Sequence, residues 1–245
     1  MAKRGSSDVA FFLTDGYSIL GAMSTIGDEA EEMTEETTPL GVANPTHDTV
    51  GMRSFVLTQE GWYDDAANGQ HLSMVAASGT HRVINYGYSG NVIGRMVMGY
   101  ASTLQTKYVR MAERATLHKA NAEYLGSGRV EQGVVLQPLA AIAGDGDTEA
   151  DGFDGTAQSS AGGAAYLQVT ALDLDGHDDL TVTIRDSADD MTYADLVAFT
   201  VVTAAPDAER VVVAGTVERY VAVEWEFGGT GTSPTATIMA AFARF

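Results

Sequence analysis

Apolar and polar residues alternate with a period of two along most of the second half of the chain. Short runs rich in Val, Thr, Ile and aromatic residues are separated by turns such as DGHDD, DSADD and GGTGTSP. Such runs, spaced about ten to fifteen residues apart, are typical of an antiparallel β-sandwich. The predicted strands cover residues 165–172, 180–186, 196–202, 209–215, 219–227 and 235–245.

The first half also has mainly strand composition. Residues 104–125 are ambiguous, because their Ala, Glu, Lys and Met favour a helix whereas their period-two pattern favours strands. The strands predicted on either side favour the strand interpretation. Those flanking strands are predicted at residues 9–14, 53–63, 81–88, 92–101 and 133–139.

The stretch EGWYDDAANGQHLSMVAAS (60–78) places Asp64 and Asp65 shortly before His71. It fits either a catalytic or metal site, or a strand that runs into a capped helix. Asp65 is suited to cap a helix, because its carboxylate would accept hydrogen bonds from the first free backbone NH groups. Since no nucleophile or set of oxyanion donors is near, we favour the architectural interpretation, with one short helix at about residues 65–78.

Composition excludes several kinds of chemistry. The chain has 245 residues and no cysteine, which excludes disulfides, thiolate nucleophiles and cysteine-based metal sites. No GxSxG, P-loop or Rossmann pattern occurs, and no two histidines form an HExxH or HxH pair. We therefore expect no enzymatic activity and no cofactor, with an acidic hydrolase as the least favoured alternative. The histidines are His47, His71, His81, His118 and His177.

The charge is strongly negative and unevenly distributed. The net charge of −19 argues against non-specific nucleic-acid binding, which depends on neutralising phosphates. Residues 1–143 carry 15 acidic and 10 basic side chains, whereas residues 144–245 carry 18 and 4. The change falls at GDGDTEADGFDG (144–155), whose Gly- and Asp-rich composition indicates a linker. We therefore predict domains at residues 1–143 and 156–245.

The segment DGDTEADGFDGT (145–156) partly matches a calcium-binding loop. An EF-hand loop needs Gly at the sixth position and Glu at the twelfth, where this chain has Ala150 and Thr156. A solvated turn is the favoured interpretation, and a weak surface calcium site is left open.

The segment GDEAEEMTEE (27–36) contains six acidic residues and no basic one. Repulsion between like charges three or four residues apart argues against an isolated helix. Two interpretations remain: a flexible solvated loop, or an arm that becomes ordered against a basic patch on another subunit.

The hydropathy of the chain predicts neither a membrane-spanning helix nor a signal peptide. No window approaches the ~20 consecutive apolar residues that a spanning helix needs. The start, MAKRGSSDVAFFL, lacks the apolar core of a signal peptide. We expect folding in a cytoplasm and no membrane insertion.

The order of motifs in the first half resembles the tail tube (major tail) proteins of long-tailed, siphovirus-like bacteriophages. The motifs are ETTPLG (36–41), THDTVG (46–51), FVLTQEGWYDD (55–65) and AEYLGSGRVEQGVVL (122–136). The resemblance covers most of residues 10–140. The second half looks like a β-sandwich appended to such tail and virion proteins.

This resemblance implies a mainly β fold and a structural role in a virion. Residues 1–143 would form a tail-tube-type β-sandwich or barrel with one short helix and an acidic loop at about 27–41. Residues 156–245 would form an exterior antiparallel β-sandwich. The protein would be assembled in the host cytoplasm into the virion tail, as stacked hexameric rings through which the viral genome is ejected.

The resemblance also implies partners. They are further copies of the chain, other tail proteins, and DNA that passes through the lumen without specific binding. The family's long loop reaches a neighbouring ring or subunit, and the matching positions here are Glu35, Glu36, Thr37 and Thr38.

The alternative hypothesis is a virion or surface binding module whose second half recognises carbohydrate. Host-surface glycans would then contact exposed aromatic residues such as Tyr193 or Trp225, although the strand pattern around Trp225 favours a core position. If the sandwich is merely appended, removal of residues 156–245 leaves tube formation intact.

Overall fold

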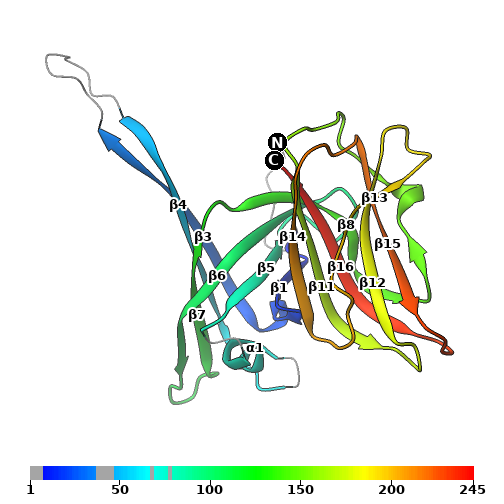
Figure 1. The fold of residues 1–245 in the computed structure, drawn as a ribbon. Coiled ribbons are helices and arrows are strands. Elements are labelled where there is room, and N and C mark those ends of the chain that lie inside the picture. The colour runs from blue at the N-terminus through cyan, green and yellow to red at the C-terminus, as the bar shows by residue number, and fades with distance from the viewer. Residues whose placement is uncertain (1–7, 37–46, 67–68, 77–78) are drawn as a thin grey trace, which may run out of the picture.

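The chain is described by a computed structural model that covers residues 8–36, 47–66, 69–76 and 79–245. These residues form mainly antiparallel β-strands (Figure 1), so the predicted fold class is confirmed. One α-helix, α1 (Gln70–Ala76), lies within the range predicted for a helix. The described residues also contain two short 3₁₀ turns, η2 (Leu20–Ala22) and η3 (Glu149–Asp151).

The first half contains eight strands among its described residues. The long β6 and the following β7 occupy the ambiguous segment 104–125, so the strand interpretation is confirmed there. The strands are β1 (Phe11–Thr14), β2 (Tyr17–Ser18), β3 (Met23–Glu36), β4 (His47–Trp62), β5 (His81–Gly87), β6 (Met96–Met111), β7 (Lys119–Ser127) and β8 (Glu131–Ala143).

The second half contains the six strands that the period-two pattern predicts, with two short additions before them. The additions are β9 (Gly146–Asp147) and β10 (Phe153–Asp154). The others are β11 (Gly163–Asp173), β12 (Asp179–Ser187), β13 (Ala194–Ala198), β14 (Asp207–Val213), β15 (Tyr220–Gly228) and β16 (Thr235–Arg244).

One large sheet runs through both halves of the molecule. Its strand order is β14-β11-β16-β8-β6-β5-β1-β2, and β7, β4 and β3 branch from β6. The branch arises because β6 is long: its first part pairs with β5 and β8, and its last part, from Thr103 to Met111, pairs with β7.

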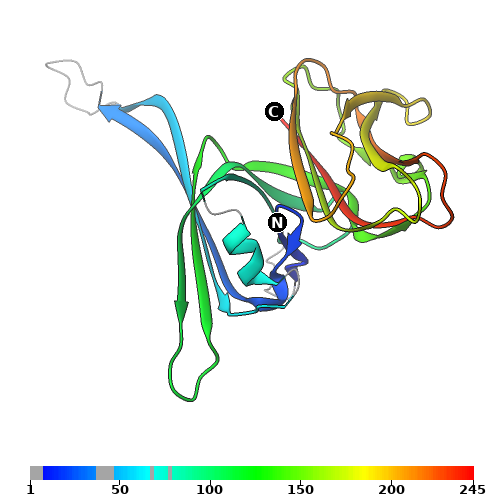
Figure 2. The ribbon, with the colours of Figure 1, turned by 60° about the horizontal axis from the view of Figure 1, so that its bottom comes forward.

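The branch forms a four-stranded layer, β3-β4-β7-β6, on the left of Figure 1. One face of this layer is buried, because Phe55, Leu57 and Tyr124 pack with Met74 of α1 and Ile84 of β5. The opposite side chains alternate outward, as the period of two requires. Figure 2 shows α1 covering the inner face of the layer.

The acidic segment 27–36 is not a loop in the structure but most of β3. It pairs with β4, with Glu31 opposite Ser54 and Glu32 opposite Arg53. A strand tolerates this sequence because neighbouring side chains point to opposite faces, which separates carboxylates that a helix would place on one face.

The second half is a two-sheet sandwich. Its smaller sheet has the order β10-β15-β12-β13, with β9 also paired to β15. This sheet faces the β8-β16-β11-β14 part of the large sheet across a core that includes Leu167, Val182, Val223, Ile238 and Phe242. The predicted antiparallel sandwich is thus present.

The two halves share a core and a sheet. Phe11, Leu13 and Val97 of the first half pack with Tyr166 and Met239 of the second. Strand β8 pairs with β16 over most of its length. The segment predicted as a linker, 144–155, contains β9 and β10, which pair with β15. The division into two domains stays a prediction. Because the core is shared, β8 takes part in the packing of both halves of the molecule.

The contact between Phe55 and Gly126 gives a test of the packing inside the four-stranded layer. These residues face each other across β4 and β7, and a Cβ atom at Gly126 would lie 1.9 Å from Cζ of Phe55. We expect Gly126→Ala to lower the free energy of unfolding by about 1–3 kcal/mol, because the buried ring must move. Urea unfolding measures this, with Gly21→Ala as the control, since a Cβ at Gly21 meets nothing within 4 Å. An effect no larger than the control's would contradict the close packing.

Candidate functional site

The stretch around Asp64 forms a turn and not a catalytic cluster. The Asp64 carboxylate accepts a hydrogen bond from the Ala66 backbone NH at 3.0 Å, and its carbonyl accepts one from the His71 NH at 2.9 Å. Asp65 is exposed, and the helix begins at Gln70. The prediction that Asp65 caps the helix is therefore wrong, because Asp65 lies within the turn from Asp64 to Ala66 and the helix begins only at Gln70.

His71 belongs to a small aromatic cluster. Its Nδ1 lies 3.0 Å from the Tyr108 hydroxyl, and its ring lies 4.9 Å from that of Tyr63. The ring of His118 follows on the other side of Tyr63, and the Arg110 guanidinium lies 5.7 Å from the Tyr108 ring centre. This cluster borders a hollow of about 340 Å³, lined by Tyr63, Arg110, Met111, Ala112, His118 and Lys119.

Two acidic residues of segment 145–156 form contacts within the second half of the chain. The Asp145 carboxylate accepts a hydrogen bond from the Phe227 NH at 2.8 Å. Glu149 forms an ion pair with Arg185. Across the part of the chain that the structure describes, no group of three or more His, Cys, Asp or Glu residues could hold a metal ion.

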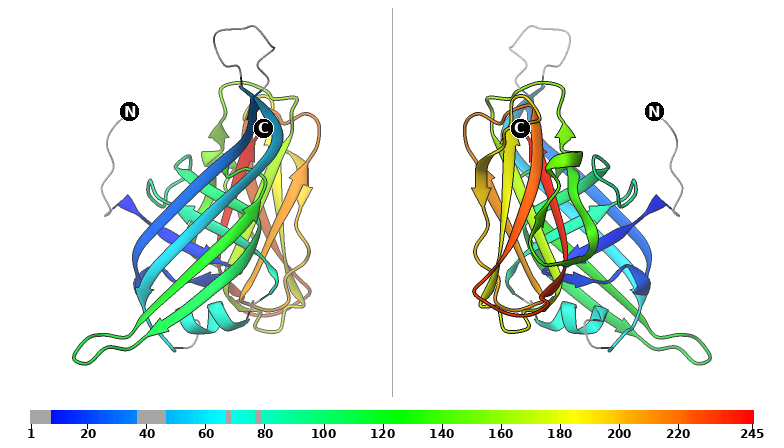
Figure 3. Two further views of the ribbon diagram at one scale, coloured as in Figure 1. Left: turned by 90° about the vertical axis from the view of Figure 1, so that its left-hand side faces the viewer. Right: turned by 90° about the vertical axis from the view of Figure 1, so that its right-hand side faces the viewer.

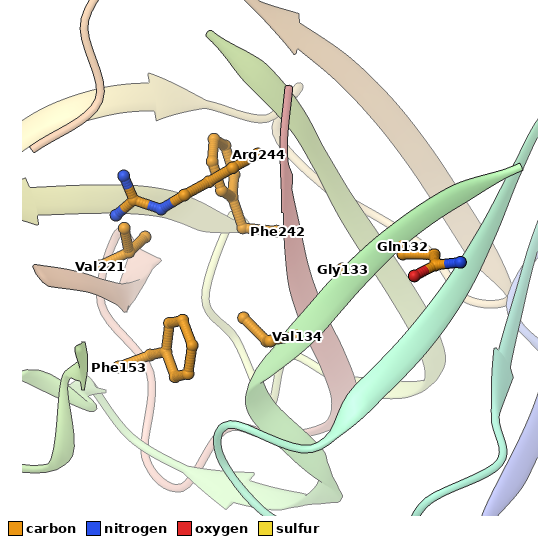
Figure 4. A pocket seen from close by; sticks show the side chains of 7 residues that line it. All are labelled: Gln132, Gly133, Val134, Phe153, Val221, Phe242 and Arg244. Carbon is orange, nitrogen blue, oxygen red and sulfur yellow. The ribbon is translucent and has the colours of Figure 1, made fainter. Parts of the chain in front are cut away.

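The narrow hollow shown in Figure 4 lies between the two sheets of the second half. It has a volume of about 140 Å³ and is lined by Gln132, Gly133, Val134, Phe153, Val221, Phe242 and Arg244. The Arg244 guanidinium donates hydrogen bonds to the carbonyls of Val217 and Arg219, at 3.2 and 2.9 Å. These bonds connect β16 to the loop that precedes β15, so we assign this arginine a structural role.

The two aromatic residues considered for carbohydrate binding are both engaged internally. Tyr193 is buried, and its hydroxyl donates to the Asp190 carboxylate at 2.6 Å. Burial and this hydrogen bond raise the pKa of Tyr193. Trp225 packs against the sandwich core, and its Nε1 donates to the Gly144 carbonyl at 3.0 Å. The expectation that Tyr193 is exposed is therefore wrong.

A buried charged cluster lies where the two halves meet. The Glu131 carboxylate accepts hydrogen bonds from the Tyr166 hydroxyl and from two nitrogens of Arg210. Burial raises the pKa of Tyr166, and the Glu131 charge raises it further. Although burial alone would lower it, the pKa of Arg210 is raised by its hydrogen bonds to Glu131 and Tyr166. No local pattern in the sequence indicates this cluster.

The four-stranded layer has two edges without a paired strand among the described residues. Strand β3 pairs with β4 only, and β6 pairs with β7 only beyond Leu104. Along the layer each neighbouring pair is antiparallel, so β3 and β6 at the two edges run in opposite directions. Figure 3, left, shows the layer from its outer face.

The outer face of this layer is polar with a few apolar residues. Trp62, Leu125 and Met111 are between 38% and 48% exposed, which is unusual for large apolar side chains in a strand. The register places the following charged residues on this face: Glu29, Glu31, Glu60, Lys107, Lys119 and Glu123.

The β3–β4 hairpin extends away from the body of the molecule (Figure 1). Glu35 and Glu36 lie in its outer part, with Asp48 and His47 opposite them. Thr37 and Thr38 lie outside the described residues. The described residues therefore include the two glutamates named for the inter-subunit arm and not its two threonines, and the arm stays a prediction.

Comparisons with known proteins give structural neighbours only. No protein-family model matches the chain, and no curated protein matches it significantly. The virion of a native gene transfer agent particle is similar with 12% identity and a TM-score of 0.42, over 53% of this chain and 98% of the other. The tail of an empty gene transfer agent particle gives 11% and 0.41, over 52% and 97%.

A third structure covers nearly the whole chain. The SPP1 Dit protein, described as a paradigm of the hub adsorption apparatus in phages that infect Gram-positive hosts, is 9% identical with a TM-score of 0.35, over 96% of this chain and 98% of the other. Among the described residues, no helix is long and apolar enough to cross a membrane.

Proposed function

We propose that this chain is a structural protein of a phage-type tail, whose copies join side by side into hexameric rings that stack into a tube. The observation that carries this proposal is the four-stranded layer with its two free edges. Exposed edge strands readily pair with another chain, and proteins that keep such edges without protection use them for assembly.

The directions of the edge strands fit a closed ring. Because β3 and β6 run in opposite directions, β3 of one copy and β6 of the next would form a further antiparallel pair when all copies have the same orientation. A ring of identical contacts closes by rotation and leaves no free edge. Layers joined in this way form one continuous wall.

The outer face of the layer would line the lumen. Acidic residues outnumber basic ones on that face, and the whole chain has a net charge of −19. A negative wall repels phosphates, so DNA would pass through without specific binding. The β-sandwich of the second half would lie outside the tube, at the opposite end of the large sheet (Figure 2).

The β3–β4 hairpin would be the arm between subunits, with Glu35, Glu36, Thr37 and Thr38 as its contact residues. The hairpin projects beyond the layer that supports it, which leaves it available to another copy. Other tail proteins would bind the ends of the tube, and the protein would be located in the virion tail. Carbohydrate recognition stays a prediction from sequence alone, since Tyr193 and Trp225 are engaged internally.

Engineered cysteines test the ring contact cleanly, because the natural chain has none. Glu29→Cys on β3 would be combined in turn with Lys107→Cys, Val109→Cys or Met111→Cys on β6. Within one copy these strands are three strand spacings apart, about 14 Å, which is too far for a disulfide that needs Cα atoms within ~7 Å. We expect oxidation of one of the three pairs to give a covalent ladder that ends at six chains.

The single variant Glu29→Cys is the control, and it should form no ladder. Absence of any ladder beyond a dimer in all three pairs would contradict pairing between β3 and β6. A ladder that continues past six chains would contradict a closed hexameric ring.

A further inference from the structure

The two ends of the four-stranded layer carry opposite charge. The middle strand β4 runs from His47, opposite Glu36, to Trp62, opposite Lys119. At about 3.3 Å per residue this strand is roughly 50 Å long. The acidic arm and the β6–β7 hairpin therefore lie at opposite ends of the same layer, as Figure 3 also shows.

The β6–β7 end is the most basic part of the chain. Residues 107–119 hold four of its 14 lysines and arginines but only one acidic residue, Glu113. The basic residues are Lys107, Arg110, Arg114 and Lys119, and all four are exposed. None of these four side chains forms a salt bridge with another described residue. Although the chain has 33 acidic residues, this basic surface has no ion-pair partner among the described residues.

The basic surface is also shaped for a partner. The hollow of about 340 Å³ beside it is lined in part by Arg110, His118 and Lys119, together with Tyr63. Leu117 at the hairpin tip is 71% exposed. Cationic side chains around a partly apolar hollow fit a strand that carries carboxylates and a few apolar side chains.

The acidic arm has that composition. Its first strand, GDEAEEMTEE (27–36), carries six carboxylates, one Met and no basic residue. The arm cannot reach the basic hairpin of its own chain, because the length of the layer separates them.

We propose that the acidic arm of one copy docks on the basic β6–β7 hairpin of the next copy along the tube. This inference rests on the proposed function and names the surface that receives the arm. The contact joins different surfaces of two identical chains, head to tail, so it does not close on itself and repeats from ring to ring. Opposite charges at the two ends also set the polarity of the stack, since reversed rings would bring like charges together.

Charge reversal on each side separately tests this contact. The hairpin variant carries Arg114→Glu and Lys119→Glu, and the arm variant carries Glu35→Lys and Glu36→Lys. We expect each variant alone to lose stacks, measured by sedimentation and electron microscopy at low salt. Ring formation, measured by the cysteine ladder, should persist in both variants, because Arg114 and Lys119 lie outside β6 and Glu35 and Glu36 lie at the far end of β3, away from Glu29.

A mixture of the two variants gives the decisive comparison. In an equimolar mixture the reversed arm meets the reversed hairpin and the natural arm meets the natural hairpin, so stacks with alternating rings should return. The two variants change the net charge in opposite directions, so a general charge effect cannot explain loss in both and recovery in the mixture. Arg95→Glu, at an exposed arginine elsewhere, should stack normally.

The outcomes separate the two proposals. If the natural protein forms rings and stacks, and the hairpin variant stacks equally well, the docking surface proposed here is wrong. Failure of the mixture to recover stacking would equally overturn it. If no cysteine pair gives a ladder, the proposed function itself fails, independently of any charge reversal.

Discussion

Removal of residues 156–245 is expected to leave the first half unable to fold. Phe11 and Leu13, both fully buried, would lose the Tyr166 and Met239 side chains that cover them. Strand β8 would lose β16, its partner over most of its length, and would expose a new edge. This expectation replaces the one drawn from the sequence, in which removal of an appended domain thins the tube but does not prevent its formation.

Circular dichroism and limited proteolysis of residues 1–155 measure the effect. We expect aggregation, or a chain without a cooperative unfolding transition. Co-expression of residues 156–245 as a separate chain is the control, since it restores the shared core without the covalent connection. A soluble 1–155 fragment that unfolds cooperatively would show that the first half is an independent domain.

Glu131→Ala is expected to lower the free energy of unfolding by about 3–5 kcal/mol, the usual range when one partner of a buried ion pair is removed. The Glu131 side chain is 5% exposed and that of Arg210 is 21% exposed, so solvent would compensate little for the lost pair. The substitution also leaves the buried Tyr166 hydroxyl without its acceptor.

Two further variants separate charge from shape at this position. Glu131→Gln keeps the size of the side chain and an acceptor oxygen, so it should cost less than Glu131→Ala. Tyr166→Phe should cost about 1 kcal/mol, the net value of one hydrogen bond. A loss below ~1 kcal/mol for Glu131→Ala, measured by urea unfolding, would contradict the role of this cluster in joining the two halves.

The local patterns of the sequence predict the strands well. All six strands of the second half follow from the alternation of apolar and polar residues, because one face of each is buried in the sandwich. The short helix follows from the residues around His71, although its first residue does not. In segment 145–156, Glu149 and Asp151 lie in a turn as predicted, whereas Asp147 and Asp154 lie in β9 and β10, and the pairing of these strands with β15 is not predicted.

The features on which the proposed assembly rests depend on pairing between distant segments. The acidic segment 27–36 has a composition that disfavours strands, and it becomes β3 because β4 is available to pair with it. The Glu131 cluster joins residues that are 35 and 79 positions apart in the sequence. The free edges of β3 and β6 are properties of the sheet order, which no single segment encodes.

The measurement that tests the central claim most directly is negative-stain electron microscopy of the purified protein at rising concentration, paired with the mass from light scattering. The account predicts rings with a central pore and six-fold end views, which stack into tubes as the concentration rises. A protein that stays a monomer of 25.8 kDa at every concentration, and in the presence of preformed tail ends, would contradict it.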